Sequence, residues 1–278
     1  MPARRRYWHR RARRVIIPAM RWALFQQVMQ KLASVRELDP RRDAARYAEQ
    51  LLGFHPRLFA PIDGGAESVA ARMAALTIAG DHLREVCRLP TYVDELERSL
   101  AVATMSASER LVRVAALAYL VCGRDLIRDD LPAGYGLIDD CISIRGAVLA
   151  TPGPRRRGGL GKFLLAELLR IRYLALAVPD EVLPLTVDAL THAATLAART
   201  RDLPNSVVEA AIRHLVNHPP NEFPARLPLP EPPEPIEVES MLPLTPGVLL
   251  EARGETLVFG FPDGSKLCRE AGGALSEG

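Results

Sequence analysis

The chain is poor in aromatic residues and in lysine. The first scarcity limits the possible fold classes, and the second bears on the possible partners. Aromatic residues make up 5% of the 278 residues, whereas hydrophobic residues reach 48%. Because β-sandwiches and barrels need more β-branched and aromatic side chains, a composition dominated by alanine and leucine favours helices. The hydrophobic content is ample for the core of one large domain or two modest ones. We therefore predict a mainly α protein built as a multi-helix bundle.

Closely spaced cysteines are also lacking. The four cysteines are scattered along the chain, at Cys87, Cys122, Cys141 and Cys268. Zinc sites and disulfide frameworks need cysteines at short, regular spacings, so neither is indicated. The pattern favours a reducing, cytoplasmic setting.

Positive charge is concentrated at the N-terminus. The first 36 residues hold nine arginines and one lysine with no acid, a formal charge of +10, and the remaining chain carries −7. Only three of the 36 basic residues are lysine. Guanidinium groups bind phosphate through paired hydrogen bonds, so this excess is compatible with phosphate-rich partners. A GC-rich genome that encodes arginine in place of lysine is the simpler explanation.

Two groups of arginines are candidates for binding nucleic acid or another anionic surface. They are Arg4, Arg5, Arg6, Arg10, Arg11, Arg13 and Arg14 in the N-terminal arm, and Arg155, Arg156 and Arg157 in a later basic loop. For the arm, three interpretations stay open: contact with nucleic acid, contact with an anionic membrane surface, and a solvated tail that leads into a core helix. Near an anionic membrane each basic residue adds about 1 kcal/mol.

The spacing of apolar residues and the capping signals predict where helices begin and end in the rest of the chain. Asp39 before Pro40 predicts a helix to about Leu52, and proline at position 90 predicts the end of a helix that begins near residue 67. The apolar run 161–178 carries four charges, each of which would cost about 2.5 to 3.5 kcal/mol at a bilayer centre. We therefore predict a central buried helix there and no transmembrane span.

Two further helix starts carry the pattern of a capping box, in which a serine and a glutamate three residues later satisfy each other's backbone N–H groups. The pairs are Ser106 with Glu109 and Ser206 with Glu209. Ten prolines between His218 and Gly247 exclude a helix in that segment. Beyond it, two turns separate short strand-like runs.

The predicted organisation has four parts. Residues 1–36 form a basic arm and first amphipathic helix, and residues 37–217 form a helical domain. A proline-rich linker over 218–246 leads to a small β appendage over 247–278, expected to be a hairpin or a three-strand meander. Because so small a sheet is marginal alone, we expect it to pack on the helical body or on a partner.

The stretch 107–150 joins two apolar helical runs through a loop that is crowded with carboxylates. Magnesium prefers carboxylate oxygens. A divalent metal there would bind through Asp125, Asp129, Asp139 and Asp140. All-helical prenyl-diphosphate enzymes use such a motif with a second acidic cluster on an opposing helix, which we do not find downstream. Capping of helix ends, where the helix dipole favours negative charge, is the leading explanation, and a magnesium site is the alternative.

Two other patterns fall short of a catalytic motif. His214 and His218 lie four residues apart, a spacing that can chelate a metal, but the segment HLVNH lacks the glutamate of a zinc-protease motif. Glycines before Lys162 are similar to a phosphate-binding loop, yet Phe163 follows the lysine where serine or threonine is required. We interpret these segments as a surface histidine pair and a basic linker.

The acidic stretch resembles the YkvA-like family, a small helical domain of unknown function. The resemblance lies in Asp125-Leu126-Ile127-Arg128-Asp129, the following Pro132 and the pair Asp139-Asp140. Arg128 stands where the family has proline. The resemblance covers about residues 107–150 and implies a helical hairpin there. It implies no settled activity, although some family members look membrane-associated.

These patterns lead us to predict a non-enzymatic helical adaptor or scaffold that acts through macromolecular contacts of its basic N-terminal arm and its C-terminal tail. Charge segregation and a modular layout are visible, whereas a complete catalytic constellation is not. We expect a protein partner, with nucleic acid or an anionic membrane as further partners of the arm, and no cofactor. The alternatives are a peripheral protein on the inner face of the membrane and a magnesium-dependent enzyme that acts on phosphorylated substrates through the aspartate-rich loop.

Overall fold

The computed structural model describes residues 22–100, 102, 104–122, 126–151, 159–220, 226–232, 236 and 244–278. The helices in these ranges are α1 (Ala23–Val35), α2 (Pro40–Phe54), α3 (Val69–Val86), α4 (Leu89–Leu100), α5 (Ala107–Leu120), α6 (Ile138–Ala150), α7 (Leu160–Ala175), α8 (Leu183–Thr200) and α9 (Asn205–Asn217). Short 3-10 helices occupy η2 (Pro56–Phe59), η3 (Gly65–Glu67) and η4 (Pro132–Leu137). The prediction of a mainly α protein is confirmed.

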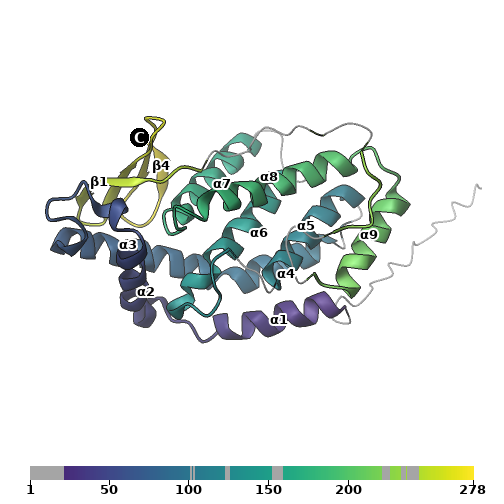
Figure 1. Ribbon diagram of the computed structural model, residues 1–278, viewed down its shortest axis with the longest axis horizontal. Coiled ribbons are helices and arrows are strands. Elements are labelled where there is room, and N and C mark those ends of the chain that lie inside the picture. Colours follow the sequence, from purple (N-terminus) through teal and green to yellow (C-terminus); the bar gives the residue numbers. More distant parts are fainter. Residues whose placement is uncertain are drawn as a thin grey trace, which may run out of the picture.

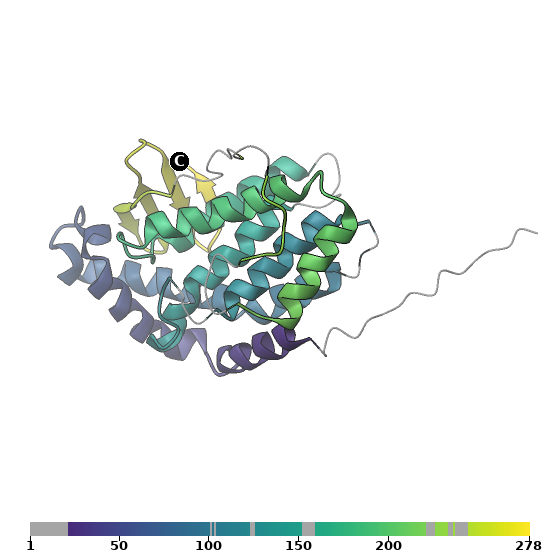
Figure 2. The same cartoon turned by 45° about the vertical axis from the view of Figure 1, so that its right-hand side comes forward.

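Helix α6 is the centre of the bundle. It packs against α5, α7 and α8, and α5 in turn packs against α8 and α9 (Figure 2). Nearly every side chain of α6 is buried, including Ile138, Ile142 and Ile144. The predicted central helix at 161–178 corresponds to α7, which exposes one side; the central position belongs to α6. Lys162 and Arg170 are exposed and keep part of the α7 surface in water, whereas Glu167 is buried.

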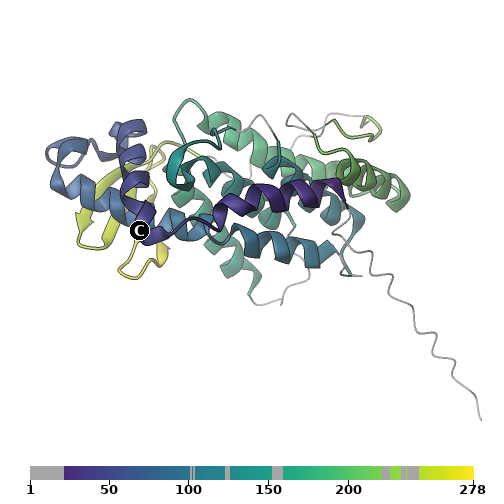
Figure 3. The same ribbon diagram turned by 90° about the horizontal axis from the view of Figure 1, so that it is seen from below.

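Helix α1 lies across the outside of the bundle (Figure 3). Its apolar face, with Leu24, Val28 and Leu32, is buried, and the helix contacts α4, α5 and α9. The repeat of apolar residues at three- and four-residue steps therefore forms one buried stripe, as expected for a surface helix.

The two proline signals have different outcomes. Asp39 caps α2 by accepting a hydrogen bond from the Arg41 N–H at 2.8 Å, and Pro40 is the first helical residue, as predicted. The prediction that Pro90 ends a helix is wrong: α3 already ends at Val86, and Pro90 lies in the first turn of α4. A proline is tolerated there because the first N–H groups of a helix need no partner within the helix.

The predicted capping box at Ser106 is confirmed. The Glu109 N–H donates to Ser106 Oγ at 3.1 Å, and the Ser106 N–H donates to Glu109 Oε2 at 2.8 Å. The second predicted box is wrong. Helix α9 begins at Asn205, one residue before the predicted Ser206 cap, and has no side-chain cap. The carboxylate of Glu209 forms an ion pair with Arg110 of α5 instead.

The C-terminal tail forms an antiparallel sheet in the order β1 (Val248–Arg253), β2 (Thr256–Gly260), β3 (Lys266–Arg269) and β4 (Leu275–Glu277). The predicted meander is thus present, and β4 extends it by one strand. The sheet sits at one end of the elongated molecule beside α3 and α7, and α9 lies at the other end (Figure 1). Its apolar side chains join the same core as the helices, among them Leu249, Leu257, Phe259 and Leu267. The tail therefore packs on its own chain.

The described part of the proline-rich linker lies along the body and contains no helix. Leu227 and Leu229 pack against the core, and Arg199 of α8 donates to the carbonyl oxygen of Pro230 at 2.7 Å. Among the described residues, no helix combines the length and the apolarity that a membrane crossing requires.

Candidate functional site: an arginine-lined cleft

The first candidate was the aspartate-rich loop, and its described carboxylates have structural partners. Asp139, buried in the first turn of α6, accepts hydrogen bonds through Oδ2 from Tyr119 Oη at 2.7 Å and from the N–H groups of Leu126 and Ile127 at 3.1 and 3.2 Å. Burial raises the pKa of Asp139 to about 6, although these hydrogen bonds lower it. Asp139 thereby holds the loop against the end of α5.

Two further acids of this loop attach α1. The Lys31 ammonium lies 2.8 Å from Asp129 and 3.0 Å from the buried Asp140. Asp125 lies outside the described residues. Within the residues that the structure describes, no group of three or more His, Cys, Asp or Glu side chains could hold a metal ion. The Lys31 ammonium occupies the position between Asp129 and Asp140 that a metal ion bound by both carboxylates would need.

The predicted basic contact residues lie outside the described ranges. They are Arg4, Arg5, Arg6, Arg10, Arg11, Arg13 and Arg14 of the arm, and Arg155, Arg156 and Arg157 of the later loop. The histidine pair is described: His214 and His218 are exposed, and their rings stack with centroids 5.0 Å apart. The pair caps the end of α9, where a ring nitrogen of His218 donates to the carbonyl oxygen of His214 at 3.2 Å.

A cleft of about 380 Å³ lies near the start of β1 and includes His55. Nε2 of His55 lies 2.7 Å from Tyr135 Oη and 3.0 Å from the carbonyl oxygen of Ala177. Burial lowers the pKa of His55, so the ring is held neutral. The described lining includes no serine, threonine or cysteine that this imidazole could activate. These hydrogen bonds join the start of η2 to η4 and to the segment after α7.

Sequence reasoning missed a buried charge cluster in the middle of the bundle. Arg145 of α6 is 3% exposed and forms ion pairs with Glu85 of α3 and Glu167 of α7. It also donates to Tyr92 Oη and lies 4.8 Å from the centre of the Tyr92 ring. Burial alone would raise the pKa of Glu85, but the Arg145 guanidinium outweighs it and holds that pKa below its usual range.

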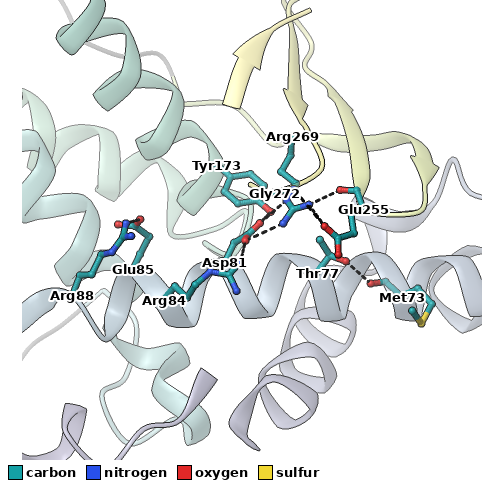
Figure 4. Close-up of polar contacts among 10 residues, drawn as sticks. All are labelled: Met73, Thr77, Asp81, Arg84, Glu85, Arg88, Tyr173, Glu255, Arg269 and Gly272. Atoms are coloured by element: carbon teal, nitrogen blue, oxygen red, sulfur yellow. Dashed lines mark hydrogen bonds and ion pairs between the residues drawn. The ribbon is translucent and has the colours of Figure 1, made fainter. Parts of the chain in front are cut away.

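A second cluster, shown in Figure 4, joins the sheet to the helical body. Arg269 of β3 donates through Nε to Asp81 Oδ2 of α3 at 2.8 Å, and Tyr173 of α7 donates to the same oxygen at 2.9 Å. Arg269 also donates to the carbonyl oxygen of Glu255 at 2.6 Å. The Arg269 side chain is only 4% exposed. We call the Asp81–Arg269 pair the body–sheet joint.

An open cleft of about 430 Å³ lies over these two clusters, between α3, α7 and the turn that leads into β4. Its guanidinium groups come from Arg84 of α3, from Arg88 in the turn between α3 and α4, and from Arg170 of α7. Their side chains are 54%, 56% and 44% exposed. Gly272 and Gly273 form part of the opposite rim. We call this feature the arginine cleft.

Each arginine of the cleft pairs with the acid three residues earlier in the chain. The pairs are Arg84 with Asp81, Arg88 with Glu85 and Arg170 with Glu167. The same three carboxylates are also bound from the inside by Arg269 or Arg145. Five arginines therefore share three carboxylates, and the exposed ones are only partly neutralised.

Part of this pattern was visible in the sequence. An acid and an arginine three residues apart are neighbours on a helix, and three such pairs occur in α7, in α3 and across the C-terminal end of α3. The inner arginines gave no signal, because Arg145 and Arg269 lie 60 and 188 residues from their partners on α3.

Comparisons with known proteins return nothing: no family model, no curated protein and no solved structure matches the chain. Residues 107–150 do contain two helices, α5 and α6, which pack against each other. The resemblance to the YkvA-like family stays a prediction.

Proposed function

We propose that this protein is a non-enzymatic adaptor or scaffold, and that the arginine cleft is a docking point for an acidic group of a partner protein. The observation that carries the proposal is the sharing of three carboxylates by five arginines at the seam of body and sheet. Partly neutralised guanidinium groups on fixed helices supply binding and orientation. They supply neither a nucleophile nor a general base.

The body–sheet joint supports the proposal. Arg269 connects β3 to α3 through Asp81, and Tyr173 brings α7 to the same carboxylate. The elements that line the arginine cleft are thus tied to one another beneath its floor. A pre-organised surface loses little conformational entropy when a partner binds, which favours a scaffold.

Affinity purification of the tagged full-length protein from cell extract tests the proposal. We would compare the wild type with the cleft variant Arg84→Gln/Arg88→Gln/Arg170→Gln. The matched control is Arg41→Gln/Arg46→Gln/Arg213→Gln, in which exposed arginines of α2 and α9 lose the same charge. We expect a protein that is captured by the wild type and the control, survives nuclease treatment and is lost with the cleft variant.

Two results would contradict this function. Capture that disappears with nuclease alone would identify nucleic acid as the partner. Turnover of a small phosphorylated substrate by the purified protein, lost in Asp129→Asn or in the cleft variant, would make it an enzyme.

A further inference from the structure

We propose that the arginine cleft recognises a phosphate monoester, carried as a phosphorylated side chain by the partner protein. This inference rests on the proposed function and adds the chemistry of the group that docks. It is carried by the way in which each of three carboxylates is shared between an inner and an outer arginine.

Each of the three acids binds one inner and one outer arginine. Arg269 binds both oxygens of Asp81, at 2.8 and 3.2 Å, and Arg84 binds Oδ1. Glu85 and Glu167 each bind Arg145 through Oε2, and their Oε1 atoms bind Arg88 and Arg170. Each outer arginine is therefore oriented by one oxygen of a carboxylate whose negative charge is shared with a buried arginine.

The outer arginines retain donors for a ligand. A guanidinium group has five N–H donors in a fixed plane. Arg84, Arg88 and Arg170 each bind their carboxylate through a single terminal nitrogen, which accounts for at most two of those donors. Their side chains are about half exposed at the cleft, so the remaining donors are within reach of a bound anion.

The cleft has a net positive charge, and the number of acceptor oxygens distinguishes a phosphate monoester from a carboxylate. The five arginines and three carboxylates leave two positive charges in excess. The exposed carboxylate of Glu255, 3.8 Å from Arg269, offsets one of them on the sheet side. A phosphate monoester carries a charge between −1.5 and −2 near pH 7 and has three acceptor oxygens, about one for each outer arginine. A partner's carboxylate has two oxygens and a single charge.

The shape of the cleft agrees with a phosphorylated side chain. Its volume of about 430 Å³ exceeds that of a phosphate group and leaves room for the residue that carries it. Gly272 and Gly273, on the rim opposite the arginines, have φ angles of +87° and +88°, a conformation that glycine adopts readily. Without side chains at these two positions, this rim leaves the approach to the arginines open.

Calorimetric titration of the full-length protein at low ionic strength tests the inference. The probes are O-phosphoserine, inorganic phosphate and glutamate, used with the wild type, the cleft variant and the matched arginine control. We expect one O-phosphoserine to bind per chain, with an affinity that falls at least about tenfold in the cleft variant and is unchanged in the control. Glutamate should bind at least about tenfold more weakly than O-phosphoserine. Inorganic phosphate that binds at the same site more tightly than O-phosphoserine would identify a free anion rather than a phosphorylated side chain.

Equal loss of binding in the cleft variant and the control, or no loss in either, would overturn the inference. If the cleft variant does not fold, the single variant Arg88→Gln replaces it, because Glu85 keeps its contacts with Arg145 and Tyr92. We expect a weakening of at least about threefold for this variant, and unchanged affinity would count against the site.

Phosphatase treatment of the extract before affinity capture separates this inference from the proposed function. Loss of the captured protein after treatment, and its release from untreated extract by O-phosphoserine, are the expected results. Capture that survives phosphatase but still depends on the cleft arginines would overturn the phosphate inference and leave the adaptor function standing.

Discussion

Arg145 connects three helices of the bundle through buried ion pairs. It is the shared cation for two largely buried carboxylates from different helices, Glu85 and Glu167. Removing one partner of a buried ion pair leaves an uncompensated charge in a medium of low dielectric constant. Removing Arg145 therefore lowers stability by more than its ion pairs contribute in net terms, because nothing then offsets the desolvation of Glu85 and Glu167.

We expect Arg145→Met to lower the free energy of unfolding by about 3 to 5 kcal/mol. Urea denaturation followed by circular dichroism measures it. Arg88→Gln is the control, since it removes an exposed partner of the same Glu85, and we expect a loss of at most about 1 kcal/mol. Equal effects of the two variants would show that burial does not set the strength of this cluster.

His82 makes stability depend on pH. Its Nε2 lies 3.0 Å from the carbonyl oxygen of Tyr173 and must donate, so Nδ1 accepts from Tyr47 Oη at 2.9 Å. Burial lowers the pKa of His82 from 6.5 to about 4. The unfolded chain therefore takes up the proton first, and the stability from the neutral ring is lost as the pH falls from 6.5 towards 4. His82→Gln should remove up to about 3 kcal/mol of this pH-dependent loss.

Asp139 acts in the opposite direction. Its folded pKa of about 6 lies above the ordinary value of 3.8, so the folded chain protonates first and gains stability as the pH falls between these values. We expect Asp139→Asn to make the acid-induced loss of stability steeper, whereas His82→Gln makes it shallower. Urea midpoints measured from pH 7.5 to 4.5 give both slopes. Parallel curves for the two variants would contradict the assignment of these groups.

At the scale of elements, local signals predicted helix starts well where a nearby side chain accepts a hydrogen bond from the first backbone N–H groups of the helix. The cap at Asp39 and the box at Ser106 were found because all of their atoms lie within four residues of one another. The prediction failed at Ser206, where the helix begins one residue earlier and Glu209 pairs with Arg110, 99 residues away. A tertiary ion pair competes with a local cap, and sequence spacing contains no information on that competition.

The two serines give a matched test of helix capping. Ser106→Ala should lower the free energy of unfolding by about 1 kcal/mol, because the Glu109 N–H loses its acceptor. Ser206→Ala should change it by less than about 0.5 kcal/mol, since this serine is exposed and makes no cap. Thermal or urea unfolding of both variants measures the difference. Equal losses would contradict the observed start of α9.

Gly136 fixes the acidic loop against its own backbone. A Cβ atom at this position would lie 2.1 Å from the carbonyl oxygen of Arg128 and 2.8 Å from Asp129 Cα. Both are backbone atoms that cannot rotate away, so Gly136→Ala should destabilise the protein by about 1 to 3 kcal/mol. Gly53→Ala is the control, because no atom lies within 4 Å of a Cβ there. We expect equal or slightly higher stability for this control, measured by urea denaturation.

At the scale of the whole molecule, composition predicted the fold class, and the order of helical body, linker and sheet followed from proline density and turn signals. Composition could not predict which helices contact one another or how the sheet packs on the helical body. The described aspartates of the acidic loop hold α1 and α5, and the more strongly charged site lies at the seam of α3, α7 and the sheet. That seam is built by Arg145 and Arg269, which lie far in sequence from their partners on α3.

Hydrogen–deuterium exchange of the full-length protein tests most directly whether body and sheet form one unit. In the wild type, we expect the amides of β2 and β3 to be protected to an extent comparable with those of α5 and α6. Arg269→Met should raise exchange in β1 to β4 at least about tenfold while α5 and α6 stay protected, because Asp81 loses its link to the sheet. The control Arg253→Met removes an exposed arginine of the same sheet and should change little. Fast exchange of the strands in the wild type, or unchanged exchange in Arg269→Met, would contradict a platform in which the sheet is fixed to the helices.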